Sequence, residues 1–240
     1  MLGMQRALSV IYPPQCQMCA ELVAETGGLC GTCWAETPFL RGLVCDACGV
    51  SLPGFEKGRV HCDDCLTAPR PWVAGRAALS YRDMGRRIVL ALKHGDRLDL
   101  AVPAARWMLA AGKPFLEPDM LFVPIPVHWS RLLTRRYNQA AELTKALARQ
   151  SGMAHCPDAL IRTRRTAKQD GMTVEARQRN MADALAVNPK RLERLQGTRI
   201  CLVDDVMTSG ATMEAATGAL WDAGVDHVFV LLLARVEKSA

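Results

Sequence analysis

Residues 199–213 read RICLVDDVMTSGATM, and the fold of the chain can be inferred outward from this stretch. Its apolar first half is typical of a buried strand that ends in Asp204–Asp205, after which residues 207–212 form a short loop that opens a helix. In open parallel α/β sheets, ligands bind at the carboxyl ends of the strands. Backbone N–H groups of the loop can hold a phosphate there, because Gly210 permits close approach and a helix N-terminus favours negative charge. The stretch therefore predicts a phosphate-binding strand–loop–helix.

The paired acids indicate which kind of phosphate would bind. Two carboxylates would repel a bare phosphate, but they can accept hydrogen bonds from the two hydroxyls of a ribose. The stretch matches neither G-x4-G-K-[ST] nor G-x-G-x-x-G, and the alternative is a helix capped by a Ser/Thr-rich turn. The pattern favours a sugar phosphate, above all phosphoribosyl pyrophosphate (PRPP). The candidate PRPP-binding residues here are Asp204, Asp205, Thr208, Ser209, Gly210, Ala211 and Thr212.

Strands and helices are expected to alternate over the rest of the larger half. Apolar strands are predicted at 74–81, 120–127 and 227–236, and helices at 84–95, 100–111, 138–152 and 211–223. Further strands at 159–163 and 182–187 continue the alternation, whereas residues 163–180 have no clean period and indicate a long loop, or a loop and a helix. Such alternation predicts an α/β fold with a parallel sheet.

Eight of the ten cysteines form four C-x2-C pairs before residue 66. Each such turn directs two thiolates at one point, and two turns complete a closed tetrahedral site, so eight ligands imply two structural Zn²⁺ ions. Iron is the alternative metal. The pairs could interleave, but grouping in chain order closes shorter loops and is preferred. The predicted metal ligands are Cys16, Cys19, Cys30, Cys33, Cys45, Cys48, Cys62 and Cys65.

A segment with two prolines, LTAPRPW at 66–72, separates the cysteines from the alternating region. We therefore expect a double zinc-ribbon domain at 1–68 and a larger domain at 72–240. No apolar run approaches the ~20 residues that span a bilayer. Residues 1–16 lack a small-residue cleavage site, so they are predicted to form a helix of the mature protein rather than a signal peptide. These features favour a cytoplasmic protein.

The net charge of +6 is unevenly distributed. Residues 130–200 hold fifteen Lys and Arg against six acids, which suits a polyanionic partner such as a phosphorylated metabolite or nucleic acid. The alternative is an ordinary solvated surface. Residues 1–72 hold five basic and seven acidic residues, so the ribbons are poor candidates for binding DNA phosphates.

The 199–213 stretch resembles the signature of type I phosphoribosyltransferases, and the whole chain resembles the ComF competence-protein family, related to GntX. Family features matched here include an N-terminal zinc ribbon, a Leu-Lys helix, a strand ending in Pro-x-Pro, an Arg-x-x-Asn-Gln segment and an Arg…Thr-x-x-Gln…Arg-x-x-Asn segment. The matching residues are Lys93, Pro124, Pro126, Arg135, Asn138, Gln139, Arg162, Thr166, Gln169, Arg177 and Asn180. Departures are Arg136 and Tyr137 for Gly-Phe, Asp183–Leu185 for Gly-Ala-Phe, and TSG for TTG.

The resemblance implies a type I phosphoribosyltransferase-like parallel sheet, with pyrophosphate bound after an early strand and covered by a flexible basic loop at 163–180. It adds Pro124, Arg131 and Arg135 as PRPP-binding residues and Arg164 and Lys168 as catalytic candidates, with Mg²⁺ bound together with PRPP. Cations around a departing pyrophosphate would stabilise the transition state. Thr208 occupies the position where transferases acting on 6-oxopurines carry an acid, which disfavours those bases.

The family resemblance implies a role in natural competence and DNA uptake, through binding of PRPP and single-stranded DNA. The zinc ribbons could then dock a DNA-uptake or helicase-like protein. Aromatic residues for base stacking are scarce in the basic region, so contact with DNA would be dominated by phosphates. The alternative function is an active phosphoribosyltransferase in nucleotide or related metabolism.

Overall fold

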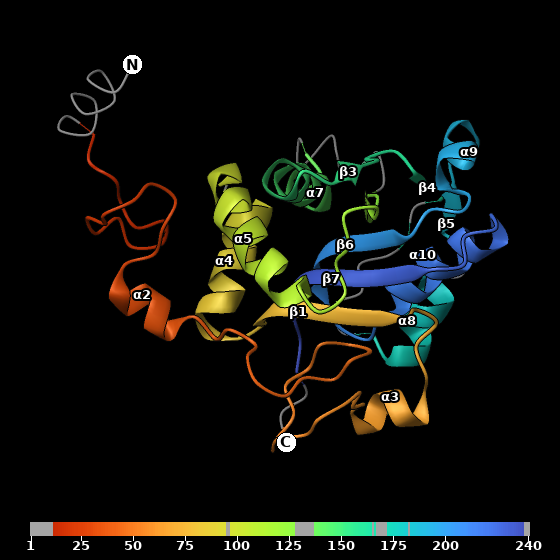
Figure 1. Ribbon diagram of the computed structural model, residues 1–240, viewed down its shortest axis with the longest axis horizontal. Coiled ribbons are helices and arrows are strands. Elements are labelled where there is room, and N and C mark those ends of the chain that lie inside the picture. The colour runs from red at the N-terminus through yellow and green to blue at the C-terminus, as the bar shows by residue number, and fades with distance from the viewer. Residues whose placement is uncertain are drawn as a thin grey trace.

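The computed structural model describes residues 12–94, 97–127, 137–164, 166, 172–181 and 183–237, so the predicted N-terminal helix lies mostly outside the described residues. Five strands form a sheet in the order β1-β7-β6-β2-β3, and every neighbouring pair is parallel (Figure 1). The strands are β1 (Ala74–Ser80), β2 (Leu121–Pro124), β3 (Ala154–His155), β6 (Ile200–Met207) and β7 (Val228–Arg235). The predicted parallel α/β fold is confirmed.

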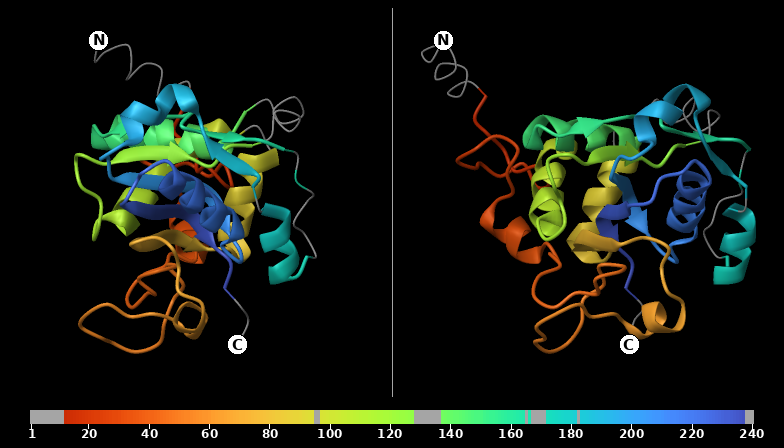
Figure 2. Two further views of the ribbon diagram at one scale, coloured as in Figure 1. Left: turned by 90° about the vertical axis from the view of Figure 1, so that its right-hand side faces the viewer. Right: turned by 45° about the vertical axis from the view of Figure 1, so that its right-hand side comes forward.

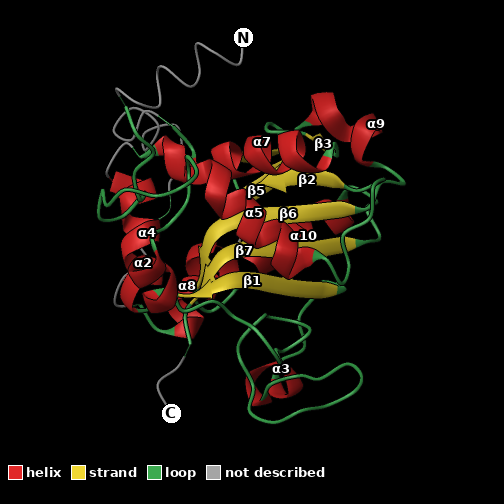
Figure 3. Ribbon diagram, turned by 60° about the vertical axis from the view of Figure 1, so that its left-hand side comes forward, coloured by secondary structure: helices red, strands yellow, loops and turns green. Residues whose placement is uncertain are grey.

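The sheet is buried on both faces, which explains the apolar strands. Cys201 and Val203 of β6 join one core with helices α4 (Asp83–His94), α5 (Ala101–Gly112) and α7 (Gln139–Ser151). Ile200 and Leu202 point to the opposite face and join a second core with α10 (Ala211–Asp222), α8 (Val174–Met181) and α9 (Leu192–Leu195). Figure 3 shows the stacked strands between these helices. Alternate strand residues therefore serve different cores.

Two of the predicted strands do not belong to the parallel sheet. The strands β4 (Leu160–Arg162) and β5 (Leu185–Val187) pair with each other, antiparallel, as a separate two-stranded sheet. In the sequence, β4 precedes and β5 follows the segment that contains α8, so their pairing brings the two ends of this segment together. Conversely, β3 was not predicted, because a two-residue strand carries no periodic signal.

Two strand boundaries also differ from the prediction. The strand β2 stops at Pro124, since Pro124 and Pro126 have no N–H group to donate to a ladder. The strand β6 continues past Asp204–Asp205, because Val206 and Met207 still pair with β7. The two acids therefore lie inside the strand, and the loop before α10 is only residues 208–210.

The two cysteine clusters lie beside different parts of this sheet. Short helices accompany them: α2 (Gly31–Glu36) in the first and α3 (Asp63–Thr67) in the second. The first lies near α4, and the second lies beneath β1 (Figures 1 and 2). The segment between them covers the exposed edge of β1, where Leu40 N–H donates to Ala78 O (3.0 Å) and Ser80 N–H to Pro38 O (2.8 Å).

The part of the chain that the structure describes also contains the short 3₁₀ helices η1 (Leu98–Leu100) and η2 (Pro189–Arg191). Among the described residues, no helix has the length and apolar character that crossing a membrane requires.

Candidate phosphate-binding site and metal centres

A pocket of about 40 Å³ lies where β6 passes into α10, at the carboxyl end of the sheet. Its lining comes from the predicted strand–loop–helix and consists of Asp204, Val206, Met207, Thr208, Gly210, Ala211, Thr212 and Met213. Five of the seven loop and acid residues predicted from the sequence are therefore brought to one pocket. The exceptions are Ser209 and Asp205.

Gly210 makes the turn into α10 possible. It has φ 95° and occupies the N-cap position, a left-handed conformation that side chains rarely adopt. A Cβ at this position would also meet Arg70 Nη1 at 3.0 Å. Because the first N–H groups of a helix have no acceptor within the helix, they can bind an anion at this end of α10.

The adjacent acids point in different directions. Asp204 lines the pocket, whereas Asp205 is 6% exposed and forms an ion pair with Lys93 of α4, with 3.0 Å between Nζ and Oδ1. This is the alternation of a β-strand, in which neighbouring side chains point to opposite faces. Asp204 Oδ1 accepts a hydrogen bond from the Asp205 N–H (2.8 Å).

Electrostatics within the site favour a ligand that brings hydrogen-bond donors or positive charge to Asp204. Burial and the neighbouring Asp205 raise the pKa of Asp204 to about 7, although Lys93 acts in the opposite direction. Burial disfavours the charged form of Lys93, but Asp205 and Asp204 outweigh it and raise the Lys93 pKa, so the ammonium stays charged. Hydroxyl donors or a cation would stabilise the ionised Asp204 carboxylate.

Two arginines bind carbonyl groups of the loop and of Met207, the residue before it. Arg235 donates to Met207 O (3.1 Å) and Thr208 O (2.5 Å), and Arg70 donates to Ser209 O (2.9 Å). Sequence reasoning missed both arginines, since one lies in the linker after the cysteines and the other ends a distant strand. Lys93 was noted only as part of a family motif, with no role assigned.

The other predicted residues are placed only in part. Pro124 ends β2 and is paired with Val203 of β6, so it lies at the same edge of the sheet as the loop. Arg164 is exposed and donates to Asn180 O (3.2 Å), which places it against α8. Arg131, Arg135 and Lys168 lie outside the described residues.

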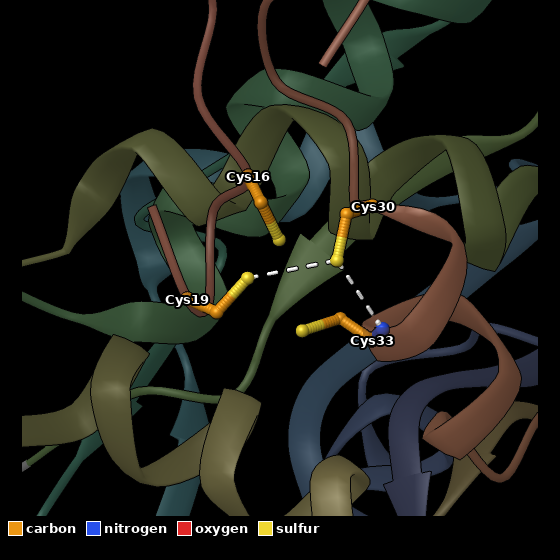
Figure 4. Close-up of side chains that lie close together, drawn as sticks. All are labelled: Cys16, Cys19, Cys30 and Cys33. Atoms are coloured by element: carbon orange, nitrogen blue, oxygen red, sulfur yellow. Dashed lines mark hydrogen bonds between the residues drawn. The ribbon is translucent and has the colours of Figure 1, made fainter. Parts of the chain in front are cut away.

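Both cysteine clusters have the geometry of a closed zinc site. In each, the four Sγ atoms lie within 4.8 Å of one another, grouped in chain order as predicted. Zn–S bonds of about 2.3 Å in a tetrahedron place sulfurs about 3.8 Å apart. Cys19 and Cys30 Sγ are 3.5 Å apart and Cys48 and Cys62 Sγ are 3.7 Å apart, so the residues fit two zinc sites of four cysteines each. Figure 4 shows the first cluster converging on one point.

Comparison with known proteins supports these assignments. The family model of the double zinc ribbon domain matches residues 7–66. The DNA utilization protein YhgH of Salmonella typhi is 32% identical over 93% of this chain and 97% of its own. Competence protein F of Haemophilus influenzae is 25% identical over 87% of this chain and 90% of its own.

Among solved structures, a glutamine PRPP amidotransferase from B. subtilis matches 59% of this chain and 30% of its own chain, with 17% identity and a TM-score of 0.39. The chain spans less than a third of that enzyme. The identities and coverage of the sequence relatives, together with the two zinc sites and the parallel sheet, show that this chain belongs to the ComF competence-protein family, which includes the YhgH proteins.

Proposed function

We propose that the chain binds PRPP or a related ribose phosphate at the β6–α10 loop. The 5′-phosphate would accept hydrogen bonds from the N–H groups at the start of α10 and from the hydroxyls of Thr208, Ser209 and Thr212. Asp204 would accept hydrogen bonds from ribose hydroxyls, while Asp205 stays paired with Lys93. The observation that carries the proposal is the pocket in which Asp204 faces the left-handed Gly210 turn.

The pyrophosphate end of the ligand would carry Mg²⁺, which bridges oxygen ligands. Pro124 ends the strand beside β6, and the chain that follows it carries Arg131 and Arg135, which we propose as pyrophosphate partners. Arg164 and Lys168 would close over the ligand from the 163–180 segment. Positive charge in these positions complements both the ligand and a developing pyrophosphate leaving group.

Isothermal titration calorimetry with Mg²⁺ and PRPP tests the site. The Asp204→Ala, Asp205→Ala double variant is expected to lose binding, while Asp222→Asn, which changes an exposed acid at the far end of α10, is expected to bind like the wild type. Binding that is unchanged in the double variant would rule out this site.

We propose further that the protein acts in DNA uptake or DNA utilization, as the names of its relatives indicate for them. The supporting observation is the basic excess of residues 130–200, which contributes Arg164 and, on α8, Arg177 and Arg179. Single-stranded DNA would bind there mainly through its phosphates. The protein would work in the cytoplasm, with the proposed ribbon domain at 1–68 docking a DNA-uptake or helicase-like protein and the domain at 72–240 holding the ligand.

Fluorescence anisotropy with labelled single-stranded DNA tests the DNA proposal. Affinity should fall steeply with salt and fall again on neutralising Arg164, Arg165 and Lys168, but not on neutralising the exposed Lys57 and Arg59 of the second ribbon. An affinity that changes neither with salt nor on neutralising Arg164, Arg165 and Lys168 would contradict the proposal.

An active phosphoribosyltransferase is the second candidate, and the pairing of Lys93 with Asp205 beside the proposed ribose-phosphate loop favours it. Incubation with Mg²⁺, PRPP and a panel of bases, with release of pyrophosphate measured, separates the two. Release with a base other than hypoxanthine or guanine would identify an enzyme. Tight binding of PRPP without release would indicate a binding module.

A further inference from the structure

The second zinc ribbon (Cys45, Cys48, Cys62, Cys65) is joined to the loop at residues 208–210, here called the phosphate loop, through Trp72 and Arg70. This residue lies between α3 and β1, and its side chain is 9% exposed. Its Nη1 donates to Ser209 O (2.9 Å) in the loop and to Glu214 Oε1 (2.5 Å) in the first turn of α10. One buried cation thus binds both the loop and the helix that follows it.

Trp72 lies between the Arg70 guanidinium and the second ribbon. Its Nε1 donates to Ala47 O (2.5 Å), between Cys45 and Cys48, and its ring lies 5.9 Å from the Arg70 guanidinium carbon. Gly75 on β1 packs so closely on the same turn that a Cβ would meet Ala47 O at 2.4 Å. Trp72 and the cysteines of this ribbon share one core with Met207 and Ala211, the residues on either side of the loop. The turn that presents the metal ligands is therefore fixed relative to the loop.

The first zinc ribbon (Cys16, Cys19, Cys30, Cys33) has a comparable arginine that points elsewhere. Arg97 donates to Gln17 O (2.9 Å) and pairs with Asp99, and these two side chains are 41% and 47% exposed. The buried cysteines of the first ribbon belong to the core that contains α4, α5 and α7, on the face of the sheet opposite to the core of the second ribbon. Arg97 is thus a matched control for Arg70: it joins a ribbon to the sheet domain without contact to the phosphate loop among the interactions of the described residues.

We propose that Arg70 is a positioning residue through which zinc in the second ribbon holds the phosphate loop ready for its ligand, so that this metal site and the ribose-phosphate site are energetically coupled. Zinc would fix the turn from Cys45 to Cys48. Trp72 donates to Ala47 O in that turn and lies against the guanidinium, so it would hold Arg70 where its Nη1 meets Ser209 O and Glu214. With the Ser209 carbonyl bound on one side, the N–H groups of the loop stay directed to the other side. Coupling between two sites is reciprocal, so the ligand must also stabilise the metal site.

The coupling to ligand rests on the proposed function, whereas the effect of Arg70 on the loop does not. Hydrogen exchange followed by mass spectrometry measures the loop directly, without PRPP. Peptides covering residues 208–213 are expected to exchange about tenfold faster in Arg70→Gln than in the wild type or in Arg97→Gln. Each variant is first checked for two zinc ions per chain and for a melting temperature near that of the wild type. Equal exchange in all three proteins would overturn the positioning role.

The second experiment measures coupling in both directions. Arg70→Gln should weaken calorimetric Mg²⁺–PRPP binding by about tenfold, with Arg97→Gln unchanged. In the wild type and Arg97→Gln, Mg²⁺–PRPP should slow the release of one of the two zinc ions to a zinc-selective chelator by about fivefold, and this protection should vanish in Arg70→Gln. Protection that persists in Arg70→Gln would overturn the coupling.

A conservative variant guards against misfolding. Arg70→Lys keeps the charge but not the planar set of donors, so its loop exchange and affinity should lie between those of the wild type and Arg70→Gln. If the wild type binds no PRPP, the proposed function fails, and the exchange result still decides whether Arg70 positions the loop. If PRPP binds equally well in every variant, the function stands and the coupling is wrong.

Discussion

The two zinc ribbons have the same four-cysteine ligand set but are built into the molecule differently. In the first, Cys19 is exposed, and the arginine that ties the ribbon to the sheet domain is paired on the surface. In the second, Cys45 and Cys48 are completely buried and share a core with α10 and with Met207, which precedes the phosphate loop. Two zinc sites with the same ligands can therefore differ in their surroundings: the second packs against β6 and α10, whereas the first packs against the opposite face of the sheet.

Substituting one metal ligand in each ribbon should give the largest difference in stability between the two ribbons. Cys45→Ser and Cys16→Ser should each lose one zinc ion per chain, and binding of zinc is folding free energy for the segment that it closes. We expect the second-ribbon variant to lose about 10 °C in melting temperature and the first-ribbon variant about half of that. Circular dichroism melts with metal analysis provide the measurement. Equal losses would show that the two ribbons are equally peripheral.

The ion pairs that attach the ribbons should differ in the same direction. Arg76 of β1 pairs with Asp46 of the second ribbon, with side chains 13% and 16% exposed, and Asp46 also accepts from Val60 N–H (2.7 Å). Removing one partner of such a pair leaves a partly buried charge, so Arg76→Ala should cost about 2 kcal/mol. Arg97→Ala breaks a surface pair and should cost roughly 0.5 kcal/mol. Urea unfolding of the two variants is the test, and a larger loss in Arg97→Ala would contradict it.

The dependence of stability on pH sharpens the same contrast. Burial alone would raise the pKa of Asp46, but hydrogen bonds from Arg76 and from Val60 outweigh it, so the folded-state pKa lies below the usual 3.8. A depressed carboxyl pKa contributes stability that is present above the unfolded-state value and is lost as the pH falls through the folded-state value. Between pH 5 and 3 the wild type should therefore lose more stability than Arg76→Ala. Parallel pH profiles of the unfolding midpoint would show that Asp46 does not contribute.

The smallest difference is expected at two tryptophans. Trp72→Phe removes the hydrogen bond to Ala47 O and leaves that carbonyl buried, which should cost about 1 kcal/mol. Trp34 in the first ribbon is 44% exposed, and Trp34→Phe should change stability by less than about 0.5 kcal/mol. Denaturant unfolding of both variants measures the difference, and a reversed order would count against the distinction between the ribbons.

The sequence by itself determined the elements whose signals are local. The C-x2-C spacing predicted two metal clusters, because a short turn must bring its two thiolates together, and the shorter loops predicted their grouping in chain order. The apolar run, the acids and Gly210 predicted the strand, loop and helix of the phosphate site, because strand burial and left-handed backbone leave clear residue preferences. The alternation of strands and helices predicted the parallel sheet.

Only the tertiary structure decided which residues meet across the chain. It turned Asp204 toward the pocket and Asp205 toward Lys93, which lies more than a hundred residues away in sequence. It withdrew β4 and β5 from the main sheet, and it brought Arg70 and Arg235 under the carbonyls of the loop. Periodicity and spacing carry no information about such contacts, because an ion pair or a hydrogen bond between distant segments depends on how whole elements pack and not on the residues beside it in the chain.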